Sequence, residues 1–327
     1  MISFPANPQI GDLFSYFTRT WIWNGLAWQS AIYRPDGAIV SDVAPSGAKA
    51  GWSWWDRINS VLYVYDGAAW VESSQSFRTG DLDAWDYIYR VQAADGQDLE
   101  DNVIAAMLKF VIGCKADGIW NAIKASCVMA GARTLNGALV PLKGAAPTNV
   151  NFQSTDYNRK TGIKGDGATK YLNSNRNNNA DPQNSKHLSA WVTANPTTSA
   201  NAFAIIGVSS TTGTSHIAHN SIGKTLRLNQ SSDTPISASA ALGFFGASRN
   251  SSTQVSSRQG GVTSIASATS AAPFNRNYGV FAYTITAGGN VFSDGSVTFY
   301  SIGESIDLSK LDSRVSTLMT DINTAIP

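Results

Sequence analysis

The chain has 327 residues, of which 43% are apolar and 14% are charged, and its net charge is +1. This length and apolar content allow one or two domains with a real core. A charge-poor, nearly neutral chain has no broad electrostatic field, so we expect no nucleic-acid partner. No apolar run is long enough to cross a bilayer, and MISFPANPQIG lacks the basic and apolar regions of a signal peptide. We therefore expect synthesis in the cytosol and no membrane insertion.

Residues 1–76 contain two aromatic segments of the same design, WIWNGLAWQS (21–30) and YVYDGAAWVE (63–72). If Asn24-Gly25 forms a two-residue type I′ turn, Trp23 faces Leu26. Alternation along the strands then places the aromatic side chains of each hairpin on one face. These aromatic residues are Trp21, Trp23, Trp28, Tyr63, Tyr65 and Trp70. We interpret them as the core of a small β module, because so small a module needs its aromatic side chains inside. The alternative is an exposed platform that stacks sugars.

Residues 77–135 are predicted to be a helical spacer or cap. DLDAWDYIYRVQ (81–92) looks strand-like at its end. Residues 99–114 then place apolar side chains at helical spacing, and IWNAIKASCVMAG (119–131) repeats that pattern. We expect two short helices, which either separate two domains or cover the next one. The two cysteines, Cys114 and Cys127, are predicted to be small buried residues rather than a disulfide or a metal pair.

Residues 136–327 read as a series of short strands separated by Gly, Asn, Ser and Pro clusters. Strand-sized runs include LNGALVPL, HLSAWVTA, AFAIIGV, KTLRLNQ, YGVFAYTI and SVTFYSIG. The fold class is therefore mainly β, with an antiparallel β-sandwich or jelly roll. DLSKLDSRVSTLMTDINTAI (307–326) predicts a C-terminal helix that begins after an Asp307 N-cap. Its apolar stripe serves either an assembly of copies or contact with its own sandwich.

Two short motifs suggest ligand chemistry, and both are better explained structurally. AHNSIGKT (218–225) fits a relaxed phosphate-loop pattern, but TLRLNQ after it alternates like a strand, whereas a phosphate loop needs a helix there. His216 and His219 would share a face only on a helix. Their surroundings read as strand or loop, so we expect surface or hydrogen-bonding histidines. No metal site is predicted.

Glycoside hydrolysis requires two carboxyl groups facing each other across the substrate. The chain has three glutamates, and only Glu304 lies in the predicted sandwich. Asp156, Asp166 and Asp181 stand next to residues typical of turns, where aspartate is commonly a turn former. No G-x-S-x-G motif is present. We therefore predict no catalytic residues and no enzymatic activity.

The second half resembles virion proteins of tailed phages that infect marine cyanobacteria. Three segments carry this resemblance: ALVPLKGAAPTNVNF, DYNRKTGIKGDGATKYLNSNRNNNADPQNSKHLSAWV and FSDGSVTFYSIGESIDLSKLDSRV. They are similar to a laminin G-like, concanavalin-type lectin sandwich, and the resemblance covers roughly residues 118–325. The repeats in residues 1–76 also look like short modules of phage tail and fibre proteins. Laminin-type domains can carry a calcium ion at the rim, but no residue here maps onto that site, so no cofactor is predicted.

The resemblance implies a tail fibre or receptor-binding component that recognises a host-surface polysaccharide. A capsid decoration, neck or baseplate protein without a receptor is the alternative, and a polysaccharide depolymerase is less favoured. The hairpin repeats would attach the chain to other virion proteins, in a virion assembled in the host cytoplasm. A homo-oligomer is expected, with a trimer favoured. The candidate glycan surface is the Asn-rich loop 173–184, which reads equally well as a solvated turn; its candidate residues are Asn175, Arg176, Asn177, Asn178 and Asn179.

Overall fold

The computed structural model describes residues 4–16, 19–33, 38–58, 61–72, 81–197, 203–210, 213–220, 223–237, 242–285 and 290–327. Its contacts divide the chain into two compact units, Met1–Gly80 and Asp81–Pro327. None of the helices in the described ranges is long and apolar enough to cross a membrane.

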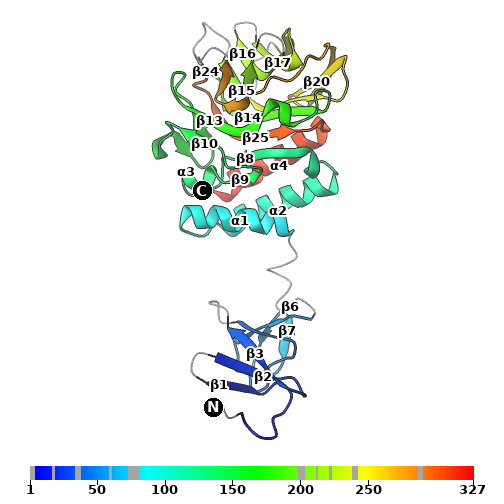
Figure 1. Ribbon diagram of the computed structural model, residues 1–327. Coiled ribbons are helices and arrows are strands. Elements are labelled where there is room, and N and C mark those ends of the chain that lie inside the picture. The colour runs from blue at the N-terminus through cyan, green and yellow to red at the C-terminus, as the bar shows by residue number, and fades with distance from the viewer. Residues whose placement is uncertain are drawn as a thin grey trace. The chain divides into compact units, whose positions relative to one another are not determined.

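The first unit is a seven-stranded sheet with its strands in chain order (Figure 1). Neighbouring strands are antiparallel except for β4 and β5, which are parallel. The strands are β1 (Leu13–Tyr16), β2 (Arg19–Trp23), β3 (Trp28–Tyr33), β4 (Ala38–Ser41), β5 (Ser53–Asp56), β6 (Val61–Tyr65) and β7 (Trp70–Glu72).

The two predicted hairpins form, but the predicted turn is wrong. Trp23 pairs with Trp28, and not with Leu26, so the loop has four residues instead of two. The Asn24 side chain causes the difference, because its Oδ1 accepts hydrogen bonds from the N–H groups of Leu26 (2.9 Å) and Ala27 (2.8 Å). Leu26 projects outward and is 89% exposed. The same turn forms in the second hairpin, where Asp66 Oδ1 accepts hydrogen bonds from the N–H groups of Ala68 (2.7 Å) and Ala69 (2.8 Å).

The second unit contains two nine-stranded sheets, antiparallel except for the pair β15 and β23. The first sheet contains β10 (Thr148–Val150), β13 (Tyr171–Asn177), β15 (Phe203–Ser209), β16 (Thr214–Asn220), β17 (Gly223–Gln230), β18 (Thr234–Ser237), β22 (Asn277–Val280), β23 (Ala282–Ile285) and β24 (Asn290–Phe292). The second contains β8 (Ile123–Val128), β9 (Pro141–Lys143), β11 (Tyr157–Asn158), β12 (Gly162–Lys164), β14 (Lys186–Ala194), β19 (Gly243–Arg249), β20 (Gln254–Gln259), β21 (Val262–Ser267) and β25 (Ser296–Gly303).

The sandwich core lies between these sheets, and strands such as β14 and β17 contribute alternate side chains to it. On β14, Leu188, Ala190 and Val192 are buried in it. On β17 of the other sheet, Leu226 and Leu228 meet them in the same cluster. This period-two burial is what the sequence pattern required. The prediction of a mainly β chain with an antiparallel β-sandwich is confirmed.

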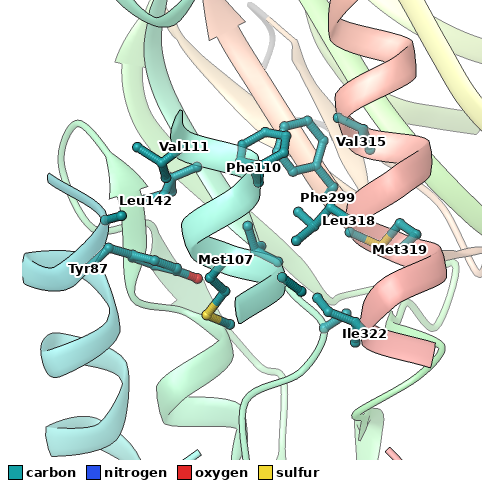
Figure 2. Packing of buried hydrophobic residues seen from close by; sticks show 14 of the residues in the cluster. Tyr87, Met107, Phe110, Val111, Leu142, Phe299, Val315, Leu318, Met319 and Ile322 are labelled. Atoms are coloured by element: carbon teal, nitrogen blue, oxygen red, sulfur yellow. The ribbon is translucent and has the colours of Figure 1, made fainter. Parts of the chain in front are cut away.

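A layer of helices packs against the second sheet, as Figure 2 shows. The helices are α1 (Leu82–Asp95), α2 (Asp101–Ala116) and the C-terminal α4 (Leu308–Ala325). Phe110 of α2 meets Phe299 of β25 edge to face, with ring centroids 5.8 Å apart. The C-terminal helix is confirmed, and Asp307 caps it through the N–H groups of Ser309 and Lys310. The apolar stripe of α4 packs against α2 and the second sheet, so it is buried within its own unit.

Two element predictions in this region were wrong. The end of residues 81–92, which looked strand-like, is part of helix α1, because Ala84, Tyr87, Ile88 and Val91 lie on one buried helical face. Residues 119–131 contain strand β8 instead of a second helix. The strand is buried on both sides, with Cys127 in the sandwich core and Val128 among the helices. A short apolar run of this kind has no period that separates a strand from a helix.

Short helical elements complete this unit: α3 (Leu135–Ala138), η1 (Trp120–Ala122), η2 (Ser154–Asp156) and η3 (Asn178–Ala180). The run LNGALVPL therefore begins as a helical turn and only its end joins β9. Cys114 and Cys127 are free and buried, as predicted. Burial raises the pKa of both thiols to about 12, which makes them unreactive packing residues.

Candidate functional site on the sandwich rim

The Asn-rich segment 173–184 was predicted to be a loop, but its first part, with Asn175, Arg176 and Asn177, is the end of strand β13, and the short helix η3 follows directly. Asn175 and Asn179 are exposed, as a surface role requires. Asn178 is 0% exposed, so its assignment to a glycan surface was wrong. The reason is local: Asn177 caps η3 by accepting a hydrogen bond from the Asn179 N–H, and the turn points Asn178 inward.

Asn178 is the centre of a buried polar network. Its Oδ1 accepts hydrogen bonds from Lys186 Nζ (2.9 Å) and from the Tyr278 hydroxyl. Its Nδ2 donates to the Gly213 carbonyl at 3.3 Å. Burial lowers the pKa of Lys186 to about 8 and raises the pKa of Tyr278. Asn178 therefore satisfies other buried groups instead of binding a ligand.

Most of the other candidate side chains are also used within the protein. Arg176 forms an ion pair with Asp181, whose side chain is 1% exposed. Asn175 Nδ2 donates to the Ala146 carbonyl at 2.8 Å. Asn177 Nδ2 donates to Asn275 Oδ1 at 2.9 Å. The loop is thus held rigidly, and Asn179 is the candidate residue that projects most freely.

This loop lies beside two other segments at the rim. Gln183 Nε2 donates to Ser270 Oγ at 2.9 Å, and the Gln183 carbonyl accepts from Asn229 Nδ2 at 3.0 Å. The Asn229 carbonyl in turn accepts from the Ala271 N–H at 2.5 Å. The loop therefore meets the end of strand β17, at Asn229, and the segment that follows β21. These connections gather side chains from both sheets.

Next to this junction is a polar pocket of about 270 Å³. It lies between the β17–β18 turn and the end of β21. Hydroxyl, amide and carboxyl groups dominate its lining, which consists of Gln230, Ser231, Ser232, Asp233, Thr234, Ser267, Ala268 and Thr269. Such groups bind neutral polar ligands by hydrogen bonds and give them a fixed orientation.

The buried side chain of Arg249 holds the pocket floor in place. Its guanidinium donates to Gln230 Oε1 at 2.9 Å and to the Ala268 carbonyl at 2.8 Å. It also donates to the Leu228 carbonyl at 2.7 Å, so it ties the two sheets together. Gln230 Nε2 then donates to Thr234 Oγ1 at 2.9 Å. The pocket is therefore arranged before any ligand arrives.

Asp233 is the charged group of the pocket. Its Oδ1 lies 3.2 Å from His216 Nε2 and 2.7 Å from Arg227 Nε. The hydrogen bond from His216, followed by that from Arg227, holds the pKa of Asp233 at about 2. Burial lowers the pKa of His216, whose Nδ1 has no hydrogen-bond partner. Asp233 is therefore an ionised, oriented hydrogen-bond acceptor, and its side chain is 38% exposed.

The carboxyl groups of this unit are held in ways that suit acceptors and ion pairs. Asp156 pairs with Lys170, and Asp166 accepts three backbone N–H groups in a turn that lowers its pKa. Every carboxyl group with a shifted pKa in the described ranges is shifted downward. The carboxyl group that acts as the general acid of a glycosidase needs a raised pKa instead. No cluster of three metal-ligating side chains occurs among the residues described.

The other motifs behave as the sequence predicted. Gly223, Lys224 and Thr225 lie on strand β17, with no helix after them, so the phosphate-loop match is a coincidence. His216 and His219 lie on strand β16, where their odd spacing sends them to opposite faces. His216 belongs to the pocket described above. Sequence reasoning missed the pocket because its residues come from separate strands; a lone Arg249 in the apolar run GFFGASR was the one available signal.

The six aromatic residues of the repeats form two clusters that are partly buried. Trp21, Trp23 and Trp28 belong to the first, in which the rings of Trp23 and Trp28 are 5.7 Å apart. Tyr63, Tyr65 and Trp70 belong to the second, with Tyr65 and Trp70 5.3 Å apart. These six rings are each only partly buried, and the buried cluster described in the first unit consists of Ile22 and Ile39. The interpretation of the six rings as the core of the module was therefore wrong, because Ile22, between Trp21 and Trp23 on β2, points to the opposite face of the strand. They support the module and leave ring surface available.

No family model and no curated protein sequence matches the chain. Domain 4 of AbnA, a GH43 arabinanase from Geobacillus stearothermophilus solved with arabinotriose, is similar at 13% identity with a TM-score of 0.36, over 53% of this chain and 82% of that one. The botulinum neurotoxin serotype D binding domain is similar at 15% identity with a TM-score of 0.38, over 60% of this chain and 52% of that one. A mutant of Trypanosoma rangeli sialidase is similar at 12% identity with a TM-score of 0.42, over 93% of this chain and 48% of that one. The chain thus spans about half the length of the last two proteins. Likenesses this weak carry no inference about ligand or activity.

Proposed function

We propose that the chain is a structural protein of a tailed-phage virion that attaches to a glycan on the host surface without cutting it. The oriented Asp233 carboxylate in the rim pocket carries this proposal. A fixed carboxylate beside hydroxyl and amide groups is suited to the hydroxyl groups of a sugar. The resemblance of the sequence to cyanophage virion proteins supplies the biological setting.

The pocket's size and position fit the end of a saccharide chain. Its volume of about 270 Å³ is near the lower limit of small-molecule pockets. It lies between loops, which vary freely while the sandwich holds them. Rigid support from Arg249 and Gln230 reduces the ordering cost of binding.

The state of the Asp233 carboxyl group supports binding without hydrolysis. A glycosidase holds one carboxyl protonated near neutral pH so that it can donate to the leaving group. Asp233, with its pKa at about 2, stays ionised and works as an acceptor. The proposed role requires no metal and no cofactor.

In the proposed assembly, the aromatic repeats attach the chain to other virion proteins, and the rim faces the host. The virion is assembled in the host cytoplasm. A trimer suits a fibre, and contacts between copies would use surfaces other than the buried stripe of α4. The laminin G-like classification of the sandwich is part of this proposal.

A purely architectural role is the second candidate, as a decoration, neck or baseplate component. The Asn-rich loop favours it, because Asn178 and Arg176 serve internal contacts. A depolymerase is the least favoured role. Attachment and architecture differ in one observable property, namely affinity for the host surface.

The test is binding of labelled full-length protein to marine cyanobacterial cells and to their purified lipopolysaccharide. We expect saturable binding, and we expect Asp233→Asn to weaken it about tenfold or more, since a hydrogen bond to a charged group is lost. Asp321→Asn is the matched control, because Asp321 pairs with Lys109 on the helical layer and should leave binding unchanged. Absence of wild-type binding would favour the architectural role.

A further inference from the structure

A second pocket of the second unit lies where helices α1 and α2 meet strand β9, at the other end of that unit from strands β16 and β17 (Figure 1). Its volume is about 500 Å³, within the range of small-molecule sites. The residues that line it are Asp83, Lys115, Gly118, Trp120, Asn121 and Lys143. None of them belongs to the rim pocket, so the function proposed above does not use them.

Trp120 of η1 fixes the charged groups around this pocket. Its indole Nε1 donates to Asp83 Oδ2 at 3.2 Å, and its carbonyl accepts from Lys143 Nζ at 2.7 Å. The Lys143 ammonium also lies 4.4 Å from the centre of the Trp120 ring, in a cation–π contact. Because Trp120 is only 6% exposed, it supports these groups and does not offer a ligand a stacking surface.

The two lysines that line the pocket differ in their partners. Lys115 Nζ forms ion pairs with Asp81 at 2.6 Å and with Asp83 at 2.5 Å. Lys143 forms no ion pair with any residue that the structure describes, and the Trp120 carbonyl takes only one of its three N–H donors. Burial lowers the pKa of Lys143, because an ammonium without a counter-charge is costly to bury. Lys143 therefore has two donors left for an anionic group.

Asp83 and Asn121 supply the other polar groups of the pocket. The Asp83 side chain is held by Lys115 and by the Trp120 indole, yet it is 57% exposed. The hydrogen bond from Lys115 lowers the pKa of Asp83, so this carboxylate is an ionised acceptor near neutral pH. Asn121 is exposed, and its amide makes no hydrogen bond to the residues described. That amide is free both to donate and to accept.

These groups together suit a ligand that carries one carboxylate and several hydroxyl groups. A carboxylate would accept charge-assisted hydrogen bonds from Lys143, which are about twice as strong as neutral ones. Hydroxyl groups would donate to Asp83, whereas a purely anionic ligand such as phosphate would be repelled by it. A sugar acid carries both kinds of group on one small ring.

We propose that this pocket binds a uronic acid residue of an acidic polysaccharide, with its carboxylate on Lys143 and its hydroxyl groups on Asp83 and Asn121. The contacts with Trp120 hold Lys143 and Asp83 in position before the ligand arrives, which lowers the ordering cost of binding. This site goes beyond the glycan binding proposed for the rim, because it has its own residues and its own requirement for charge.

The probes are methyl β-D-glucuronide and methyl β-D-glucoside, which differ only in having a carboxylate or a hydroxymethyl group. Each is titrated at constant ionic strength into full-length protein with ¹⁵N-labelled tryptophan, and the indole N–H signal of Trp120 is followed, with Trp120→Phe assigning it. We expect saturable movement of this signal at millimolar glucuronide, because the indole N–H shares Asp83 with the ligand. The glucoside should bind about tenfold more weakly, since it lacks the hydrogen bond to a charged group.

Two variants test the placement of the ligand. Asn121→Asp, at an exposed position, should abolish the glucuronide response, because a second carboxylate in the pocket competes with the ligand for Lys143. Lys143→Met keeps an unbranched side chain beside the Trp120 ring and should remove the preference for the glucuronide over the glucoside. Lys164→Gln is the matched control, because Lys164 is an exposed lysine of β12 outside the pocket and its loss should leave the titration unchanged.

Three results would each overturn the proposal: no movement of the Trp120 signal, equal affinity for the two sugars, or an unchanged glucuronide response in Asn121→Asp. An equal response to inorganic phosphate would also overturn it, since the pocket would then bind anions in general. Asp233→Asn should leave this titration unchanged, because Asp233 lies in the rim pocket. Failure of glycan binding at the rim is therefore distinguishable from failure here.

Discussion

Lys186 and Asn178 form a buried polar pair below the Asn-rich loop. Both side chains are 0% exposed, and Tyr278 joins them through Asn178 Oδ1. A buried donor that loses its acceptor keeps the full cost of desolvation. The order of this part of the rim therefore depends on a residue that sequence reasoning assigned to the surface.

Replacing Asn178 by alanine should lower the free energy of unfolding by about 2–4 kcal/mol, because the Tyr278 hydroxyl and one Lys186 hydrogen bond lose their acceptor. Asn179→Ala, one residue further on, removes an exposed side chain and should change stability by less than about 0.5 kcal/mol. Urea unfolding of both variants measures the difference. Equal effects would contradict the buried role of Asn178.

His187 predicts how stability depends on pH. Its Nδ1 donates to the Glu304 carbonyl at 2.6 Å, so Nε2 accepts from Ser301 Oγ at 2.7 Å and the ring is neutral. Burial lowers the pKa of His187 from 6.5 to about 4. The unfolded chain therefore takes up a proton at a higher pH than the folded chain does. Stability is fully present above pH 6.5 and is lost as the pH falls toward 4.

The contribution of His187 to this loss is about 3 kcal/mol. His187→Gln keeps a donor and an acceptor without the titration, so its stability should change less over the same pH range. Chemical unfolding of both proteins at pH 7 and at pH 4.5 provides the comparison. A mutant curve parallel to that of the wild type would show that His187 does not titrate in this way.

At the scale of elements, the helical layer depends on a few large side chains. Phe110 of α2 is 3% exposed and lies against Phe299 of the second sheet, as seen in Figure 2. Phe110→Ala should destabilise the second unit by about 3–5 kcal/mol. Ile112→Ala, on the exposed side of the same helix, should cost far less, since that side chain is already 42% exposed. Thermal unfolding that ranks the two variants in the opposite order would contradict the packing.

The sequence was sufficient for elements whose pattern has a clear period and a clear end. The stripe of α4 and its Asp307 cap are of this kind. It was not sufficient for β8, where burial on both faces removes the period. The hairpin register also escaped prediction, because the Asn24 side chain replaced the expected two-residue turn with a four-residue loop.

The rim pocket could not be predicted, for a reason of another kind. Arg249 belongs to the second sheet and Gln230 to the first, and the hydrogen bond between them exists only after the sheets stack. Asp233 likewise meets His216, from which it is separated by 17 positions in the sequence. Local pattern describes neither contact. The glycan hypothesis was read from the sequence, whereas the pocket that supports it came from the structure.

At the scale of the whole molecule, the chain contains two units with separate cores. Ile22 and Ile39 form the buried cluster of the first, while the sandwich and helical clusters belong to the second. A fragment of residues 81–327 should therefore fold alone, with a urea midpoint within experimental error of the main transition of the full chain. Near-ultraviolet circular dichroism monitors both. A clear fall in the midpoint would mean that the second unit depends on the first.

Recognition without cleavage is the central claim, and one titration addresses both halves of it. Purified polysaccharide from marine cyanobacterial cells is titrated into the full-length protein in a calorimeter, and its chain length is measured by size-exclusion chromatography before and after. The account predicts saturable heat of binding, lost in Asp233→Asn, with no change in polysaccharide length. Shortened polysaccharide, or binding that Asp233→Asn leaves intact, would contradict it.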